Sequence, residues 1–464
     1  MNLVATFRLL GFGIVILGTL MTVPFLSALG KEGANASGYF FGSLVSLFCG
    51  WGLLILGAGR ALPEDIRETM LCVVLWWTLA PLFGAVPFMF EGLSGVQAYF
   101  EAVSALTTTG AWLSEEAARS SQSTILWRAL MQWLGGFTSL AIAAAIFIRP
   151  VFVGVDTVQA PFARGEQSSY GQALFTAGKT FLLAYVGVTF LASLMLALAG
   201  APAFDAMILA MSTMASGGFI PSNEGVSAYS PMVLATLLPF LFLSGVNFIF
   251  IAGISLGRQP RLQDTETGAY CLIVFSVAVL LVMLAGTGRV VEAPLHLFNA
   301  ASLMSTNAVT VGSPPPLALA LVAVLIGGSA LSTAGGLKIV RWLIVFTRAR
   351  QEIRRLIMPS QIFGRTKISE ELGVWMHFIV FTFFVGGVTL VVTSGGHPFD
   401  LSATVAIGAL SNAGPVIHLL EGEQVGYGII ENPMLQLMLC AAMILGRVEV
   451  VTVLVLFNRA FWRS

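Results

Sequence analysis

The amino-acid sequence predicts an all-α polytopic membrane protein. We expect four repeats of helix, half-helix and helix (M1-P-M2) in a pseudo-fourfold arrangement, preceded by two extra N-terminal transmembrane helices. Of the 464 residues, 57 % are hydrophobic and only 10 % are charged, whereas soluble domains carry about 25 % charged residues. Long apolar runs follow one another along the chain, and a short polar run recurs four times between them. Such recurrence at a long period is typical of an internal repeat.

Ten apolar runs are long enough to cross a bilayer core about 30 Å thick, which takes about 20 helical residues. They fall at 5–29, 38–58, 68–90, 124–148, 172–199, 231–256, 269–288, 316–346, 373–394 and 433–457. The first two stand outside the repeat pattern. The predicted boundaries are therefore 1–60 for the N-terminal pair and 61–150, 151–260, 261–368 and 369–464 for the four repeats.

Four shorter apolar stretches, of roughly ten residues each, lie between the two long helices of each repeat. They fall at 96–106, 204–213, 294–304 and 401–410. They are too short to cross the bilayer and too apolar for solvated loops, which is typical of re-entrant half-helices. Each leads into a polar run, and the last residues of these runs lie 108, 90 and 106 positions apart, at Gly110, Gly218, Ala308 and Gly414.

The placement of Lys and Arg predicts the orientation of the chain. With a cytoplasmic N-terminus, the inner loops collect most basic residues, and six of them lie in the segment 347–371. The outer loops then keep only Lys31, Arg119, Arg128 and Arg289. The half-helix entrances therefore belong to the external face. The basic segment 347–371 is suited to anionic lipid or to a soluble partner, although ordinary topology determination explains it equally well.

The predicted external face is rich in acidic residues. An acidic mouth concentrates cations and repels anions, whereas on the alternative interpretation these charges only keep the external loops soluble. The acids are Glu32, Glu91, Glu101, Glu115, Glu116, Glu224, Glu292, Asp400, Glu421, Glu423 and Glu431.

Several function classes are disfavoured by the composition. The balance of 23 Lys and Arg against 23 Asp and Glu argues against a nucleic-acid partner. The four cysteines have no CxxC spacing and the four histidines are scattered, so neither a disulfide framework nor a metal cluster is expected. The spans contain no nucleophile paired with a base, so we predict neither an enzyme nor a cofactor held by this chain.

The four polar runs have the chemistry of an ion filter. Backbone that leaves the helix inside a bilayer must be buried in protein or line water, and rings of backbone carbonyls can replace the hydration shell of a monovalent cation. Glycines at 110, 217, 218 and 414 suit the backbone conformations that turn successive carbonyls inward. The alternative, for a single run, is a turn between packed helices. The candidate ion-binding residues are Thr107, Thr108, Thr109, Gly110, Ala215, Ser216, Gly217, Gly218, Ser305, Thr306, Asn307, Ala308, Ser411, Asn412, Ala413 and Gly414.

These residues resemble those of the Trk/Ktr/HKT superfamily of potassium transport proteins, and within it the bacterial Trk membrane subunits. The resemblance covers nearly the whole chain. It rests on Ser-Ala-Leu-Thr-Thr-Thr-Gly at 104–110, Met-Ser-Thr-Met-Ala-Ser-Gly-Gly-Phe at 211–219, Ser-Asn-Ala-Gly-Pro at 411–415 and Leu-Gly-Arg-Val-Glu at 445–449.

The resemblance implies four K⁺-channel-like repeats, one conduction pathway per chain and K⁺ bound at the filter. It also implies a homodimer in the bacterial cytoplasmic (inner) membrane and a cytosolic regulatory protein that binds nucleotide. Two positions depart from the family pattern. Ala308 stands where the register expects glycine, and Ser411 stands where Trk relatives more often carry Asn. Both departures leave selectivity for potassium over sodium open.

Two features are candidate gates. The eighth span contains four glycines and a Ser-Thr pair between 327 and 338, and since Gly costs about 1 kcal/mol relative to Ala inside a helix, this stretch is predicted to unwind. It would then form a flexible gate, as in Trk and Ktr proteins; close helix packing is the alternative. The candidate gate residues are Gly327, Gly328, Ser332, Thr333, Gly335, Gly336, Lys338 and Arg447.

Arg447 lies in the last span, where an arginine normally faces a cavity or a partner. We expect it either to set an electrostatic barrier beneath the filter or to tether the segment 327–338; a structural ion pair is the alternative. Glu449 is two positions away and faces another side of the helix. Asn247, the matching polar position of the second repeat, is interpreted as helix packing.

The leading function is gated potassium uptake through a Trk-type subunit. Two alternatives remain: the potassium-translocating subunit of an ATP-driven pump, and a less selective Na⁺/K⁺ pathway or cation symporter. A symporter with a midplane site between inverted repeats is disfavoured because all four repeats place their polar loop on the same face.

Overall fold

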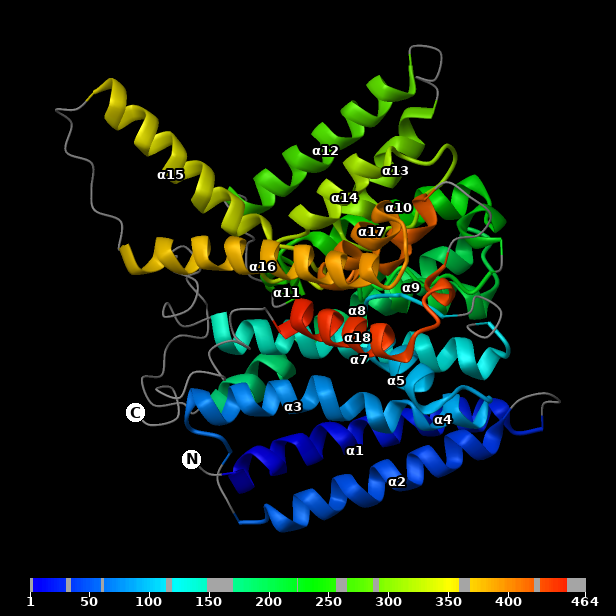
Figure 1. The fold of residues 1–464 in the computed structure, drawn as a ribbon. Helices are drawn as coiled ribbons and strands as arrows, with labels where there is room; N and C mark the ends of the chain where they lie inside the picture. Colours follow the sequence, from blue (N-terminus) through cyan, green and yellow to red (C-terminus); the bar gives the residue numbers. More distant parts are fainter. Residues whose placement is uncertain are drawn as a thin grey trace.

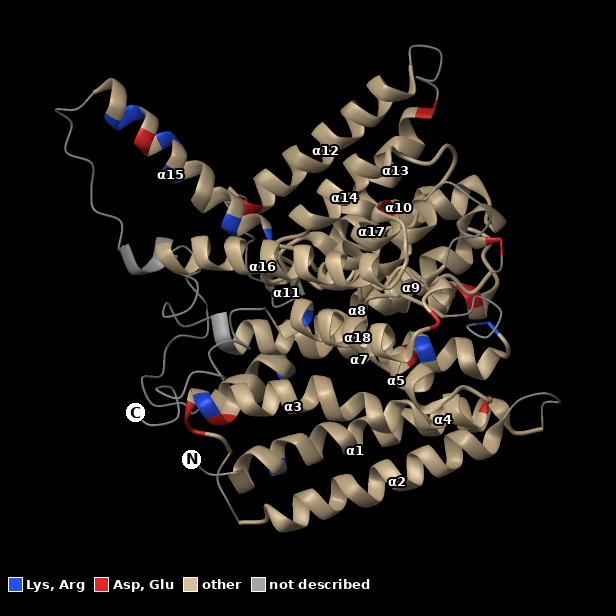
Figure 2. Ribbon diagram, in the orientation of Figure 1, with Lys and Arg blue, Asp and Glu red and all other residues tan. Residues whose placement is uncertain are grey.

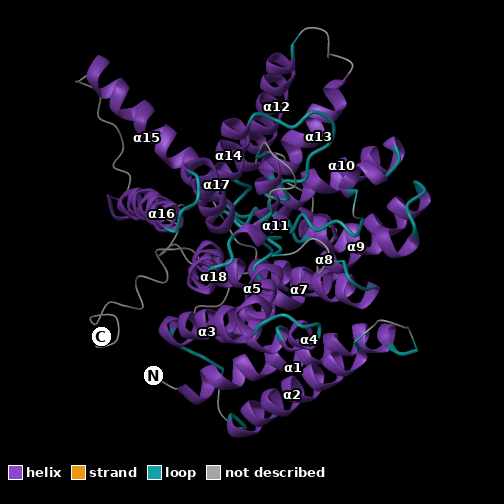
Figure 3. Ribbon diagram, turned by 45° about the vertical axis from the view of Figure 1, so that its right-hand side comes forward, coloured by secondary structure: helices purple, strands orange, loops and turns teal. Residues whose placement is uncertain are grey.

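The computed structural model describes residues 3–30, 35–59, 62–113, 119–147, 170–222, 224–255, 265–286, 292–358, 368–420 and 426–448. Within these residues every regular element is a helix, and loops connect the helices (Figure 3). The all-α prediction is therefore confirmed.

Two N-terminal helices, α1 (Leu3–Ala28) and α2 (Ala36–Leu56), lie side by side along one edge of the bundle (Figure 1). Close packing is possible because small residues lie between them: a Cβ on Gly50 would come within 2.7 Å of Val15 Cγ2. These are the two extra helices that precede the repeats.

The remaining helices follow the predicted repeat order. The first repeat comprises α3 (Ile66–Gly84), α4 (Val86–Phe90), α5 (Gly95–Leu106) and α7 (Gln122–Phe147). The second comprises α8 (Tyr170–Leu198), α9 (Ala203–Met214), α10 (Pro231–Gly245) and α11 (Phe248–Ser255). The third comprises α12 (Thr265–Ala285), α13 (Ala293–Met304), α14 (Leu317–Ile326) and α15 (Ile339–Ile357). The fourth comprises α16 (Ile368–Ser394), α17 (Phe399–Leu410) and α18 (Pro433–Val448). Short 3-10 helices lie in connecting segments: η1 (Gly225–Ala228) between α9 and α10, and η3 (Gly414–Leu419) and η4 (Tyr427–Ile429) between α17 and α18.

The half-helices α5, α9, α13 and α17 are each 12 residues long. Their starts differ from the predicted ones by one or two residues, and three of the four ends coincide. A Ser94–Gln97 capping box fixes the start of α5, because both side chains satisfy backbone N–H groups of its first turn.

Two long helices are interrupted. The eighth span breaks between Ile326 and Ile339, as the glycines predicted. The sixth span, expected to be continuous over 231–256, also breaks, at Val246 and Asn247 between α10 and α11. The interpretation of Asn247 as ordinary helix packing was therefore wrong, since this residue lies in the break.

The outer surface of the bundle is apolar. Six helices of the described chain are long and apolar enough to cross a membrane, and side chains such as Phe48, Leu183 and Phe383 are 80 %, 73 % and 76 % exposed. Charged residues gather toward two opposite faces (Figure 2). One face carries α15 with its basic residues, and we call it the α15 face; the other, where the half-helices begin, is called the half-helix face.

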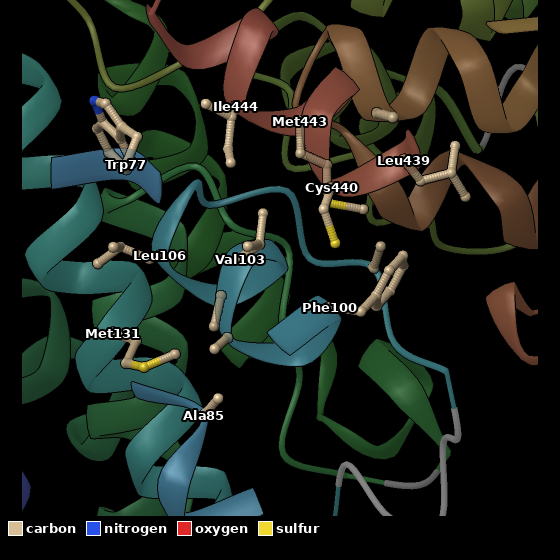
Figure 4. Close-up of a cluster of buried hydrophobic side chains, with 14 of the residues drawn as sticks. Trp77, Ala85, Phe100, Val103, Leu106, Met131, Leu439, Cys440, Met443 and Ile444 are labelled. Carbon is tan, nitrogen blue, oxygen red and sulfur yellow. The ribbon is translucent and has the colours of Figure 1, made fainter. Parts of the chain in front are cut away.

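The half-helix α5 is held in the middle of the bundle by apolar packing (Figure 4). Phe100, Val103 and Leu106 of α5 are at most 1 % exposed, and they lie between Met131 of α7 and Met443 of α18. Van der Waals contacts between closely packed helices stabilise this arrangement. This packing positions the end of α5 near the centre of the bundle.

Candidate functional site

Each half-helix ends in the same turn. The second residue after the helix has a positive φ, with values of 58°, 58°, 58° and 50° at Thr108, Ser216, Thr306 and Asn412. Its N–H bonds to the carbonyl three residues earlier, as from Thr108 to Ala105 (3.1 Å). In three repeats the next N–H reaches back five residues, as from Thr109 to Ser104 (2.9 Å), which completes a Schellman motif. The segments that follow the half-helices, 107–110, 215–218, 305–308 and 411–414, are called the filter loops below.

Only some of the left-handed residues were the expected ones. Of the four glycines assigned to this role, Gly110 and Gly218 have positive φ (70° and 65°), but Gly217 and Gly414 do not. Threonines at 108 and 306 take this conformation instead, although β-branched residues resist it. Ala308, which replaces the expected glycine, also follows the repeat, with φ 52°. The surrounding structure therefore imposes the same turn on different residue types.

A serine in three half-helices orients the filter loops. The hydroxyls of Ser104, Ser212 and Ser302 accept hydrogen bonds from the N–H groups of Ala111 (2.7 Å), Phe219 (2.7 Å) and Val309 (2.9 Å). In the fourth repeat the corresponding residue is Gly408. Because these N–H groups are bonded back to the half-helices, each loop can turn its carbonyl groups the other way.

Several oxygen atoms at the filter loops have no donor in the described part of the chain. Among those residues, no hydrogen bond reaches the backbone carbonyls of 107–108, 215–216, 305–306 or 411–412. The buried side-chain oxygens Thr108 Oγ1, Ser411 Oγ and Asn412 Oδ1 also have no partner. Buried oxygens that accept no hydrogen bond are costly unless a cation or water satisfies them. This set of oxygen atoms therefore fits a dehydrated monovalent cation.

The filter loops contact one another. Gly414 N donates to Thr109 O (2.6 Å) between the fourth and first loops, and Gly218 N donates to Asn307 Oδ1 (3.3 Å) between the second and third. A Cβ on Gly110 would collide with the carbonyl oxygen of Gly217, which joins the first loop to the second. These contacts run in chain order from the fourth loop through the first and second to the third, as loops around one axis would.

A buried ion pair supports the first filter loop. Glu101 of α5 and Arg128 of α7 are both fully buried, and Arg128 Nη2 lies 2.7 Å from Glu101 Oε2. The other carboxylate oxygen accepts the N–H of Leu113 (2.9 Å), just beyond the loop. The assignment of Glu101 to the acidic external face was wrong, as was that of Arg128 to the outer loops. The pairing was missed, although an acid inside an apolar half-helix was a signal that could have revealed it.

The segment 327–338, called the intramembrane loop, lies directly against the filter loops. Thr333 Oγ1 is 2.8 Å from Ser216 Oγ, and Gly335 N donates to Thr306 Oγ1 (2.8 Å). A Cβ on Gly335 would collide with the carbonyl oxygen of Ser411. The loop thus contacts the second, third and fourth filter loops.

Cationic side chains hold the intramembrane loop by its carbonyl groups. Arg447 Nη1 donates to Thr333 O (2.9 Å), while its Nε donates to Ser139 Oγ (2.6 Å). Lys338 Nζ donates to the carbonyls of Ser332 and Ala334. We expected Arg447 either to set an electrostatic barrier beneath the filter or to tether the intramembrane loop. The structure shows it in contact with the loop, as a tether would be. Glu449 lies outside the described residues.

A cavity lies next to the intramembrane loop. It is lined by the loop itself and by polar side chains, including Ser139, Lys338, Arg341, His377 and Arg447. Its lining is therefore rich in positive charge, which disfavours a cation there while the loop is in this position.

Comparison with known proteins identifies the family. The sequence matches the TrkH cation transport protein family over residues 40–306 and 313–464. The chain belongs to this family. It is 29 % identical over 500 residues to the Trk system potassium uptake protein TrkH of Salmonella typhimurium, with 100 % of both chains covered. It is 26 % identical to the TrkG protein of Escherichia coli, over 92 % of each chain. The crystal structure of the potassium transporter TrkH from Vibrio parahaemolyticus superposes with a TM-score of 0.86 at 26 % identity, over 100 % of both chains.

Membership in the TrkH family establishes the class of the protein. It is a membrane cation transport protein and not an enzyme, as its relatives are transport proteins and its helices are long and apolar enough to cross a membrane. The resemblance to Trk proteins inferred from the motifs is confirmed.

Proposed function

We propose that this protein takes up potassium across the cytoplasmic membrane of a bacterium through the filter loops. The observation that carries the proposal is the set of backbone carbonyls at 107–108, 215–216, 305–306 and 411–412 that no donor reaches within the described chain. Relatives over the full length are potassium uptake proteins. Carbonyl oxygens in rings replace the hydration shell of K⁺, and the C-terminal ends of the four half-helices add partial negative charge.

The intramembrane loop would act as the gate of this pathway. It contacts three filter loops through Thr333, Gly335 and their partners, so an ion leaving the filter would meet it. Gly327 and Gly336 have φ of 72° and 76° and give the loop hinge points. We infer from these contacts that the loop closes the path while it is held against the filter loops.

Orientation and partners follow from the charges. We place the N-terminus and the α15 face in the cytoplasm, since Arg348, Arg350, Arg354 and Arg355 lie on α15 (Figure 2) and basic residues favour the inside. This helix is then available to a cytosolic nucleotide-binding regulatory protein, and the working unit would be a homodimer. Nucleotide would bind to the partner only.

The proposal is tested by ion flux into proteoliposomes that contain the purified chain. We expect rubidium influx, blocked by barium, that exceeds sodium influx and needs neither ATP nor a second transported ion. Sodium influx equal to rubidium influx would identify the less selective pathway that Ala308 and Ser411 leave open. A strict requirement for an ATPase subunit, or for a proton or sodium gradient, would support the pump or the symporter instead.

Replacing Arg447 tests the gate. Arg447→Ala removes a charge-assisted hydrogen bond to Thr333 O, worth about 1.5–3 kcal/mol, so basal rubidium flux should rise at least about tenfold. Arg447→Lys separates the two roles considered for this residue, because Lys keeps the charge but not the fork of donors. Low flux in Arg447→Lys would favour an electrostatic barrier, and raised flux would favour a tether. Unchanged flux and regulation in both variants would contradict either role.

A further inference from the structure

Residues at the break between α10 and α11 form hydrogen bonds with one side of the intramembrane loop. The bonds run from Ser329 N to Gly245 O (2.9 Å), from Phe248 N to Leu331 O (2.6 Å) and from Thr333 Oγ1 to Ser244 O (3.0 Å). The interruption of α10 leaves backbone groups without helical partners, and inside a membrane these groups must be satisfied within the protein. The segment 244–248 therefore forms a socket whose hydrogen-bonding groups match those of the loop.

A buried carboxylate completes this socket. Glu266 lies in the first turn of α12 and is only 6 % exposed. Its Oε1 accepts the N–H of Ala330 (2.6 Å) and its Oε2 accepts the side-chain amide of Asn247 (3.4 Å). The amide oxygen of Asn247 in turn accepts the N–H of Ile249 (3.0 Å). One carboxylate thus bridges the loop and the break.

We propose that Glu266 is a positioning residue that latches the intramembrane loop into the socket 244–248. An ionised acceptor makes a stronger bond to a backbone N–H than a neutral one, and Gly327 and Gly336 allow the loop to leave the socket as a unit. The inference deepens the proposed function, because it rests on the loop being the gate.

Glu266 and Arg447 bind opposite kinds of backbone group in the intramembrane loop. Arg447 of α18 binds a carbonyl of the loop, at Thr333, whereas Glu266 of α12 binds an N–H, at Ala330. The loop is held at both groups, so release requires both contacts to break. Since Glu266 lies at the first turn of α12, a displacement of that helix end would withdraw the carboxylate from Ala330 and couple α12 to the gate.

The test uses the full chain in proteoliposomes and two readouts. One is basal rubidium flux. The other is the rate at which a thiol reagent modifies the chain carrying Leu331→Cys, after subtraction of the rate for the four native cysteines. Leu331 is 2 % exposed, so rapid modification there reports departure of the loop without depending on transport.

In the protein that carries Leu331→Cys, Glu266→Ala leaves the half-buried N–H of Ala330 without its acceptor, and both readouts should rise about tenfold. Glu266→Gln keeps an oxygen for Ala330 but loses the charge that strengthens the bond, so both readouts should rise by less than in Glu266→Ala. The matched control is Glu64→Ala, which removes an exposed acid and should change neither readout.

A second variant keeps the test decisive if Glu266→Ala does not fold. Asn247→Asp is nearly isosteric and keeps the acceptor for Ile249, but it places a second carboxylate against Glu266, so repulsion should raise the modification rate at least about fivefold. A modification rate unchanged in every folded Glu266→Ala or Asn247→Asp protein would overturn the latch. Faster modification without faster flux would support the latch and contradict the proposed gating role.

Discussion

Gly218→Ala is expected to reduce rubidium flux by at least about a hundredfold. Gly218 has a φ of 65°, which costs a non-glycine residue roughly 1–2 kcal/mol. An added Cβ would also collide with the carbonyl oxygen of Asn307 and would lie 2.9 Å from Pro415 Cγ. Because that carbonyl belongs to the neighbouring filter loop, the collision displaces backbone that we propose binds the ion. Flux into proteoliposomes measures the loss.

Two variants serve as controls for this prediction. Gly187→Ala adds a Cβ in α8 where no atom lies within 4 Å, so flux should be unchanged. Ala308→Gly restores glycine at the matching position of the third loop, where φ is already 52°, and should preserve flux. Normal rubidium flux in Gly218→Ala would argue that ions do not pass through these loops.

Glu101→Ala is expected to lower the stability of the folded protein by about 3–5 kcal/mol, because it breaks a buried ion pair by removing one of its partners. Arg128 is fully buried, and its guanidinium carbon lies 4.7 Å from the centre of the Phe88 ring and 5.5 Å from that of Trp112. The N–H of Leu113 loses its acceptor as well. A marked fall in the thermal midpoint of the detergent-solubilised protein would be measured.

The surface pair formed by Arg355 and Glu352 is the matched control. These side chains are 41 % and 49 % exposed, and Glu352→Ala should cost less than about 1 kcal/mol. The double variant Glu101→Gln with Arg128→Met should recover part of the loss, since it removes both buried charges. Equal midpoints for Glu101→Ala and Glu352→Ala would contradict a structural role for the buried pair.

The half-helices could be predicted closely from the sequence. The third was expected at 294–304 and is observed at Ala293–Met304, because an apolar segment too short to cross the bilayer has few alternatives to a re-entrant helix. The break in the eighth span was also predictable, since four glycines within a few residues disfavour a helix. Both signals are local, so no knowledge of neighbouring helices was needed.

The conformation of the filter loops was less predictable. Glycine propensity pointed to Gly217 and Gly414, but Thr108 and Thr306 take the left-handed conformation. The position of a residue after the end of the half-helix decided this, and its type did not, because the turn that ends each half-helix imposes its dihedral angles at a fixed place. The break at Asn247 was missed for a related reason, since its partners, Glu266 and the intramembrane loop, lie elsewhere in the chain.

By itself, the sequence predicted the apolar segments, the four half-helices and the polar loops that follow them, because bilayer thickness and the need to satisfy backbone groups act on each segment separately. Only the tertiary structure decided which polar groups meet. Glu101 finds Arg128, and Arg447 finds Thr333, because helix packing brings together groups that lie far apart along the chain, and a buried charge is stable only where packing supplies its partner.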